Sequence, residues 1–173
     1  MHSRTGSGAH SALALATMDL KLEVDIAEAR LGATNGLVVL DWLKSPTLTA
    51  AGRIGESMTR LIRKDGPPQL MLTLANATVG PPDGSTREIL TQQINQLGRT
   101  LAGVAIAVEG TGFGAAAVRA IVSGMYIVTR PTYPVKIFAS VAESSDWLVE
   151  NWKAGAKPLS TEIVAAVAAL RKR

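Results

Sequence analysis

The sequence predicts an α/β fold built on a mixed, five-stranded sheet. Three observations carry this prediction: an N-terminal segment of alternating polar and apolar residues, short uniformly apolar segments, and amphipathic segments of helical period between them. Helical segments between strands are typical of parallel strands joined by right-handed crossovers, whereas the alternating start is typical of a half-exposed antiparallel strand. The expected order is therefore β-β-α-β-α-β-α-β-α, followed by one extra C-terminal helix.

The first two expected strands are Asp19–Ile26 and Leu37–Trp42. In Asp19–Ile26 the apolar residues occupy every second position, so they share one face of a strand. Asn35-Gly36 marks a turn just before the second strand. We expect the two strands to pair as an antiparallel hairpin with a long loop.

The rest of the chain alternates between helices and strands. An apolar stripe at helical spacing follows Pro46. Ser85 with Glu88, and Ser140 with Glu143, have the spacing of a capping box, which marks a helix start. A glycine-rich turn begins the helix between them, and Ser160 precedes a last amphipathic helix. The expected strands among these helices are Leu70–Leu74, Gly103–Val108 and Val135–Phe138.

Length and composition favour one globular domain. The chain has 173 residues, of which 47% are hydrophobic and 18% charged, so disorder along its whole length is excluded. It has no cysteine, which favours a cytoplasmic location, and no apolar run of about 18 residues, so no transmembrane segment is expected. We expect a disordered leader at 1–18, a domain at 19–154 and a C-terminal amphipathic helix at 155–173.

The net charge of +4 does not indicate nucleic-acid binding. Arg4 lies in the expected leader, and three further basic residues are the last three of the chain. Without these four, positions 5–170 hold 14 basic and 14 acidic residues. Nucleic-acid binding requires clustered Lys or Arg on the body of the domain, so we expect no nucleic-acid partner.

The sequence lacks most catalytic side chains. Both histidines, His2 and His10, lie in the expected leader. Without body His or any Cys, Ser–His–Asp and Cys–His nucleophiles and the usual zinc sites are excluded. We expect no cofactor, no metal and no enzymatic activity. An enzyme would require carboxylates such as Asp41 and Glu109 to converge in a cleft.

Three short motifs give the chain a family resemblance over roughly residues 19–152. They are Leu37-Val38-Val39-Leu40-Asp41-Trp42, Val118-Arg119-Ala120, and Phe138-Ala139-Ser140-Val141-Ala142-Glu143 followed by Trp147-Leu148. With the expected element order, they resemble the STAS fold of anti-sigma-factor antagonists and transporter tails, in particular its divergent bacterial STAS/SEC14-like branch. A flavodoxin-like receiver fold is the alternative, but the opening hairpin and the missing acidic pocket count against it.

The resemblance directs attention to the helix start after the third strand. In anti-sigma-factor antagonists a serine there is phosphorylated and switches partner binding. The corresponding candidates here are Ser85, Thr86 and Arg87, although the Asp-Ser-Ser-Gly motif of that switch is absent. Helix capping alone also explains Ser85.

A second candidate site is the glycine-rich turn at 110–114. Gly110, Gly112 and Gly114 follow an apolar strand and precede a helix, a setting in which free amides meet anions. Arg119 lies further along the same helix and could reach an anion. A tight turn with close helix packing is the alternative explanation, because the turn follows a late strand and Arg130 stands where a dinucleotide site would have an acid.

These observations favour a non-enzymatic, cytoplasmic STAS-like module that binds a protein partner, either another protein or a second copy of this chain. The alternative is a small-molecule or lipid-binding domain, by analogy with SEC14-like relatives, and that function requires a deep apolar pocket. Trp42, Trp147 and Trp152 are expected in or at the margin of the core.

Overall fold

The chain folds around a single six-stranded sheet with helices on both faces. The computed structural model describes residues 18–64, 69–76, 78–97 and 100–173. The strands of the sheet lie in chain order: β1 (Lys21–Asp25), β2 (Ala29–Thr34), β3 (Leu37–Trp42), β4 (Gln69–Asn76), β5 (Leu101–Glu109) and β6 (Val135–Phe138). The helices are α1 (Leu48–Lys64), α2 (Gly84–Leu97), α3 (Gly112–Thr129), α4 (Val141–Glu150) and α5 (Ser160–Arg171). The predicted α/β class and mixed sheet are confirmed.

The prediction of five strands and one N-terminal hairpin is wrong. β2 pairs antiparallel with both β1 and β3, so the first two predicted strands are not direct neighbours. The segment predicted as the long loop forms β2, and the sequence does not indicate this strand because small residues and Gly32 give it little strand propensity. Asn35-Gly36 forms the two-residue turn of a tight hairpin between β2 and β3.

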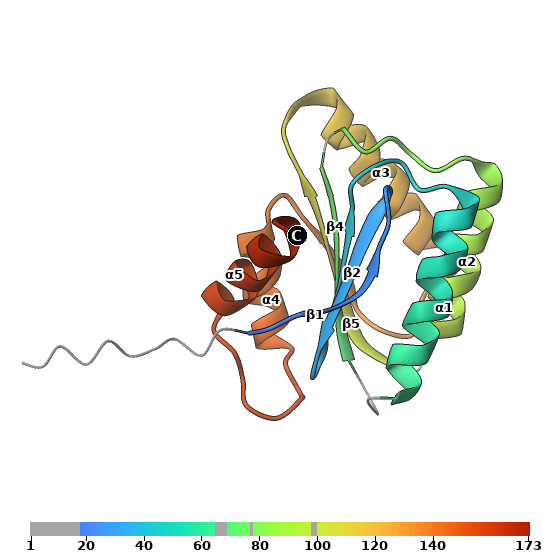
Figure 1. The fold of residues 1–173 in the computed structure, drawn as a ribbon. Helices are drawn as coiled ribbons and strands as arrows, with labels where there is room; N and C mark the ends of the chain where they lie inside the picture. The colour runs from blue at the N-terminus through green and yellow to red at the C-terminus, as the bar shows by residue number, and fades with distance from the viewer. Residues whose placement is uncertain (1–17, 65–68, 77, 98–99) are drawn as a thin grey trace, which may run out of the picture.

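The helices form two unequal layers. β3, β4, β5 and β6 run parallel, and α1, α2 and α3 are the crossovers between them. Because the strands are added in one direction, right-handed crossovers place all three helices on the same face. α4 and α5 follow the last strand and cover the opposite face (Figure 1).

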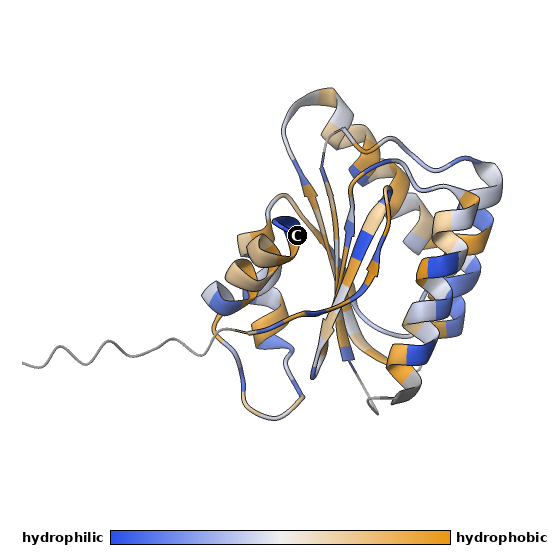
Figure 2. Ribbon diagram, viewed as in Figure 1, coloured by the Kyte–Doolittle hydropathy of each residue, from blue (hydrophilic) through white to orange (hydrophobic). Residues whose placement is uncertain are grey.

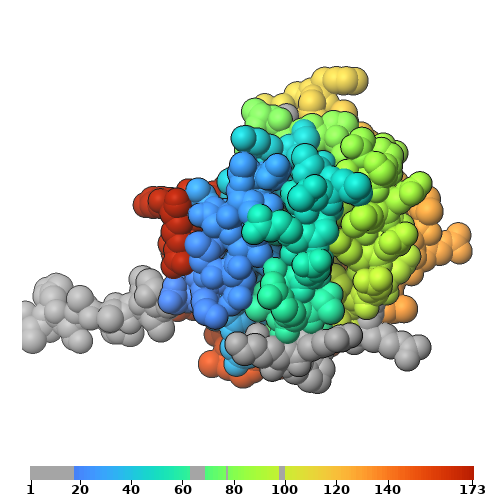
Figure 3. All heavy atoms as spheres, turned by 45° about the vertical axis from the view of Figure 1, so that its right-hand side comes forward, coloured from blue at the N-terminus to red at the C-terminus, as the bar shows by residue number. Residues whose placement is uncertain are grey.

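Each buried strand divides its side chains between the two layers. In β4, Leu70, Leu72 and Leu74 pack toward α4 and α5, whereas Met71 and Ala75 belong to the core beneath α1–α3. Helices α1 and α2 lie side by side over that second core (Figure 3) and turn hydrophilic residues outward (Figure 2). The alternation of strand side chains thus builds two separate cores.

The two predicted capping boxes have different outcomes. At α4 the Ser140 hydroxyl accepts the Glu143 N–H at 3.2 Å, as predicted. At α2 the prediction is wrong, because the helix begins at Gly84 and Asp83, two residues before Ser85, is the N-cap, accepting the Thr86 N–H at 2.7 Å. A carboxylate accepts amide hydrogen bonds strongly at a helix N-terminus, which explains why Asp83 takes this position.

The C-terminal helix is part of the same domain. Ile163, Val167 and Leu170, the predicted apolar stripe of α5, are buried against the sheet. The expected leader at 1–18 lies outside the described residues, except for Met18.

Candidate functional site

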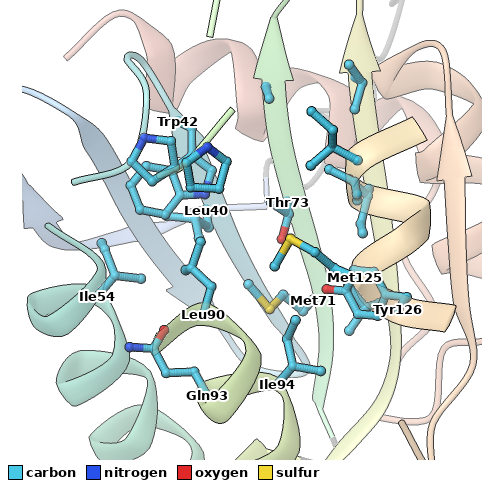
Figure 4. A pocket seen from close by; sticks show the side chains of 18 of the residues that line it. Leu40, Trp42, Ile54, Met71, Thr73, Leu90, Gln93, Ile94, Met125 and Tyr126 are labelled. Carbon is cyan, nitrogen blue, oxygen red and sulfur yellow. The ribbon is translucent and has the colours of Figure 1, made fainter. Parts of the chain in front are cut away.

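An apolar cavity lies between the sheet and helices α1–α3. Its volume is about 140 Å³. Trp42 and Thr73 line it from the sheet, and Leu90 and Met125 line it from the helices (Figure 4). The exposed Pro81 is also a lining residue, so the cavity extends to the surface beside the loop before α2.

Loose packing of α3 accounts for the cavity. Ala115 is the one residue of this helix that is buried among those the structure describes. Val118, Val122 and Tyr126 face the core but remain partly exposed. Opposite them Thr73 and Ala75, on the central strand, are too small to fill the space. An interior is normally packed to crystal-like density, so a void of this size is a distinct feature of the fold.

The polar atoms around the cavity are few, and two are already paired. The Gln93 side chain donates to the Ala51 carbonyl at 2.8 Å, and the Tyr133 hydroxyl donates to the Ile94 carbonyl at 3.3 Å. Thr73 and Tyr126 supply hydroxyls that form no hydrogen bond with another described residue. Among the described residues that line the cavity, none is Asp, Glu, Lys, Arg or His.

Both tyrosines beside the cavity are held in the neutral form. Burial raises the pKa of Tyr133 to about 12. Burial raises the pKa of Tyr126 still further, with a contribution from nearby Tyr133. Because burial disfavours the phenolate, the cavity presents uncharged hydroxyls across the physiological pH range.

A cluster of charged residues lies at the other face of the sheet, at the carboxyl ends of the strands. The guanidinium of Arg171, in the last turn of α5, donates to both carboxylate oxygens of Asp41 at 3.0 and 3.3 Å and to Glu109 at 2.5 Å. Asp41 is the last residue but one of β3 and Glu109 is the last residue of β5, so the side chain of Arg171 bridges two strands that flank β4. Partial burial lowers the pKa of Arg171, but the hydrogen bonds to the two carboxylates outweigh it and raise the pKa overall.

Arg30 extends this cluster toward the sheet edge. It donates to the Arg171 carbonyl at 2.9 Å and to the Arg173 carbonyl at 3.2 Å, and it pairs with Asp25 at 3.2 Å. Carbonyls at a helix C-terminus lack helical partners, so an arginine is a suitable cap. The cluster therefore fastens the end of α5 to the sheet.

An enzyme would require Asp41 and Glu109 to converge in a cleft. The two carboxylates do converge, but both accept hydrogen bonds from Arg171. Asp41 is buried, with 3% of its surface exposed, and its oxygens are occupied by Arg171. The arrangement is a structural ion cluster in which both carboxylates neutralise one cation. Among the described residues, no three His, Cys, Asp or Glu residues gather to form a metal site.

The candidate phospho-switch residues differ in accessibility. Ser85 is exposed, and its hydroxyl donates to Asp83 at 3.1 Å. Thr86 is fully buried, which puts its hydroxyl out of reach of a kinase acting on the folded chain. Arg87 is exposed and donates to the Pro82 carbonyl at 3.4 Å.

The glycine-rich turn is exposed and its nearby arginine is engaged. Gly110 and Gly112 have φ of +111° and +84°, values that favour glycine, and Gly114 is exposed in the first turn of α3. Arg119 does not point to the turn as a free cation, since it donates to the Val108 carbonyl at 3.0 Å. The structure thus brings Arg119 back to the end of β5.

The tryptophans lie in or beside the two cores, as expected. Trp42 is buried and lines the cavity. Trp147 is partly buried against Phe138, with 6.1 Å between ring centroids. Trp152 is also partly buried, and its indole N–H donates to the Ala154 carbonyl at 2.6 Å.

The outer face of α3 is apolar and exposed. Phe113, Ile127 and Val128 are 90%, 71% and 81% exposed. By length and composition α3 could cross a membrane, and it is one such helix in the described part of the chain. Length and composition alone are weak evidence that a helix spans a membrane. Here α3 lies against the sheet as the crossover from β5 to β6.

Comparison with known proteins identifies no family. No family model matches, and no curated protein matches. One matching solved structure is described as an enoyl-CoA hydratase from Geobacillus kaustophilus HTA426. It is 8% identical, covers 86% of this chain and 89% of its own, and gives a TM-score of 0.37. Similarity at this level carries no conclusion about fold or activity.

Sequence reasoning missed both the cavity and the Arg171 cluster. Arg171 is one of the three basic residues that end the chain, and its place one turn after the buried Val167 marks it as the end of a packed helix. The sequence feature that indicates the cavity is the presence of methionines and of Thr73 in segments that are otherwise aliphatic.

Proposed function

We propose that this protein is a binding module that takes up a small apolar molecule between its sheet and helices α1–α3. The supporting observation is the apolar cavity of about 140 Å³ in the larger core. An empty apolar cavity of similar size is known to bind a benzene-sized molecule. This function corresponds to the small-molecule alternative in the sequence analysis, and it requires no catalytic residue.

Two further features support uptake of a ligand. Met58, Met71 and Met125 all line the cavity, and methionine side chains adapt readily to the shape of a guest. The covering helix α3 is loosely packed, so a guest can enter without breaking a tightly packed core. The cavity wall is thus both adjustable and accessible.

The test is a titration of the full chain with p-xylene, followed through the methionine methyl signals by NMR. We expect the signals of Met71 and Met125 to shift, whereas Met18, which packs in the opposite core, should not. Unchanged Met71 and Met125 signals up to the solubility limit of p-xylene would contradict the proposed function.

Two phenylalanine variants on α3 provide a matched control. Val122 lines the cavity, so Val122→Phe should fill it and abolish the p-xylene shifts. Val128 is 81% exposed on the outer face, so Val128→Phe should bind like the original protein. Equal binding by both variants would place the ligand outside the cavity.

A second candidate function, the regulatory protein-interaction module expected from the sequence, is supported by the outer face of α3. Exposed Ala116, Ala120 and Gly124 repeat every four residues there, between the exposed Phe113 and Ile127. Small residues let two helices approach closely, and Arg119 is the one charged residue of α3, so like-charge repulsion is small. We propose a second copy of this chain as the partner, related by a two-fold axis.

Sedimentation velocity across a range of protein concentrations tests this self-association. Ala120→Glu should weaken the dimer, because it places two like charges at the centre of the interface. Ala165→Glu, an exposed alanine on α5, should leave the dimer intact. A monomer at every concentration would exclude the second copy as partner.

A further inference from the structure

The chemistry of the cavity wall specifies the kind of molecule it accepts. Thr73 interrupts an apolar strand at the middle of the sheet. Its neighbours in register are Leu40 on β3 and Ile106 on β5, which are both buried and apolar. The Thr73 hydroxyl therefore stands as a polar group within an apolar surface.

This hydroxyl faces the cavity with its hydrogen-bonding capacity unused. Figure 4 shows Thr73, Met71 and Met125 pointing into the same space from the sheet and from α3. Thr73 forms no side-chain hydrogen bond with another residue of the described chain, whereas the amide N–H of Gln93 and the hydroxyl of Tyr133 each donate to a backbone carbonyl. A hydroxyl in an apolar site is stabilised most by a ligand that forms a hydrogen bond with it.

The wall also excludes charged guests. Because none of the lining residues in the described part of the chain carries a charge, an ionised carboxylate or amine beside them would lose its hydration without gaining a counter-charge. The volume limits the apolar part of the guest to about the size of one substituted benzene ring.

We infer that the ligand of this cavity is an uncharged molecule with a compact apolar body and a single hydrogen-bonding group, which pairs with the hydroxyl of Thr73. This inference rests on the proposed function. It makes Thr73 the specificity-determining residue of the site. Among the described lining residues, Tyr126 supplies the other unpaired hydroxyl. Because Tyr126 lies on the loosely packed α3, its hydroxyl is held in place less firmly than the hydroxyl of Thr73 on the central strand.

Three probes of matched shape test the inference on the full chain: p-xylene, p-cresol and 4-methylbenzoate. They share one methylated ring and differ in a methyl group, a hydroxyl or a carboxylate. Affinities come from the shifts of the Met71 and Met125 methyl signals. We expect p-cresol to bind about three- to tenfold more tightly than p-xylene, as one additional hydrogen bond allows. We expect 4-methylbenzoate to bind more than about tenfold more weakly than p-cresol.

Variants then assign the preference to one residue. Thr73→Val keeps the shape and should remove the advantage of p-cresol while p-xylene binds as before. Thr73→Ser keeps a hydroxyl and should retain the advantage, as should Tyr126→Phe. Retention of the advantage in Thr73→Val, or its loss in Tyr126→Phe, would overturn the assignment to Thr73.

The outcomes separate this inference from the proposed function. If p-xylene binds but p-cresol binds no more tightly, the specificity inference is wrong and the cavity still binds apolar guests. If 4-methylbenzoate binds as tightly as p-cresol, the exclusion of charge is wrong. If none of the probes shifts Met71 or Met125, the proposed function itself fails.

Discussion

Arg171 donates hydrogen bonds at 3.0 and 3.3 Å to the two carboxylate oxygens of Asp41, a residue 130 positions earlier in the chain. The pair joins the end of the last helix to the end of a central strand. Since Asp41 is buried and Arg171 is one-third exposed, the carboxylate depends on this arginine for its neutralisation. The stability of the whole domain is thus expected to respond to the last turn of α5.

Arg171→Met should lower the free energy of unfolding by about 3 kcal/mol, because it leaves Asp41 as a buried charge without its partner. Arg173→Met is the matched control. Arg173 pairs with the exposed Asp19 at 3.5 Å, so its loss should cost less than about 1 kcal/mol. Urea unfolding measures both, and equal losses would contradict the structural importance of the Arg171–Asp41 pair.

Gly36→Ala should destabilise the domain by about 2–3 kcal/mol. Gly36 has φ of +88°, and an added Cβ would lie 2.5 Å from the Cβ of Ala154 and 3.0 Å from the Trp152 ring. Gly112→Ala is the control, because its φ is similar at +84° but no atom lies within 4 Å. It should cost about 1 kcal/mol from backbone strain alone. Thermal unfolding that ranks the two variants in reverse would refute the close contact at Gly36.

The two tyrosines of the chain should resist ionisation while the protein is folded. Burial raises the pKa of Tyr133 to about 12 and that of Tyr126 beyond this value, whereas both titrate near pH 10 when unfolded. The unfolded state therefore releases protons first, so stability is complete below about pH 10 and falls as pH rises toward 12. Absorbance at 295 nm should show little tyrosinate at pH 10.5, in contrast to the same sample in guanidinium. Midpoints near pH 10 in the folded protein would contradict the burial of these hydroxyls.

Asp83→Ala should lower the urea midpoint more than Ser85→Ala. Asp83 accepts the Thr86 N–H at the N-cap of α2, and the pKa of its carboxyl is lowered, first by that backbone hydrogen bond. The exposed Ser85 only donates to Asp83, so its removal leaves the helix start capped. A larger effect of Ser85→Ala would restore the serine to the N-cap position predicted from the sequence.

Local signals identified most of the elements. The stripes of α1 and α5 and the Ser140 cap depend on residues within a few positions of one another, and all are found in the structure. β2 was missed because Ala29, Ala33 and Gly32 have little strand propensity of their own. They form a strand because the neighbouring strands pair with them: Ala33 lies in register between β1 and β3, and Ala29 pairs with Trp42 of β3.

The sequence by itself determined the α/β class, the parallel crossovers and the absence of His and Cys from the body of the domain, because periodicity and composition are properties of the chain alone. Only the tertiary structure decided that Arg171 lies over Asp41 and Glu109 and that an apolar cavity remains beside Thr73. A cavity is the space left when α3 meets the sheet, and an ion cluster requires strand ends far apart in sequence to meet. Both depend on non-local packing, which no short segment of the chain encodes.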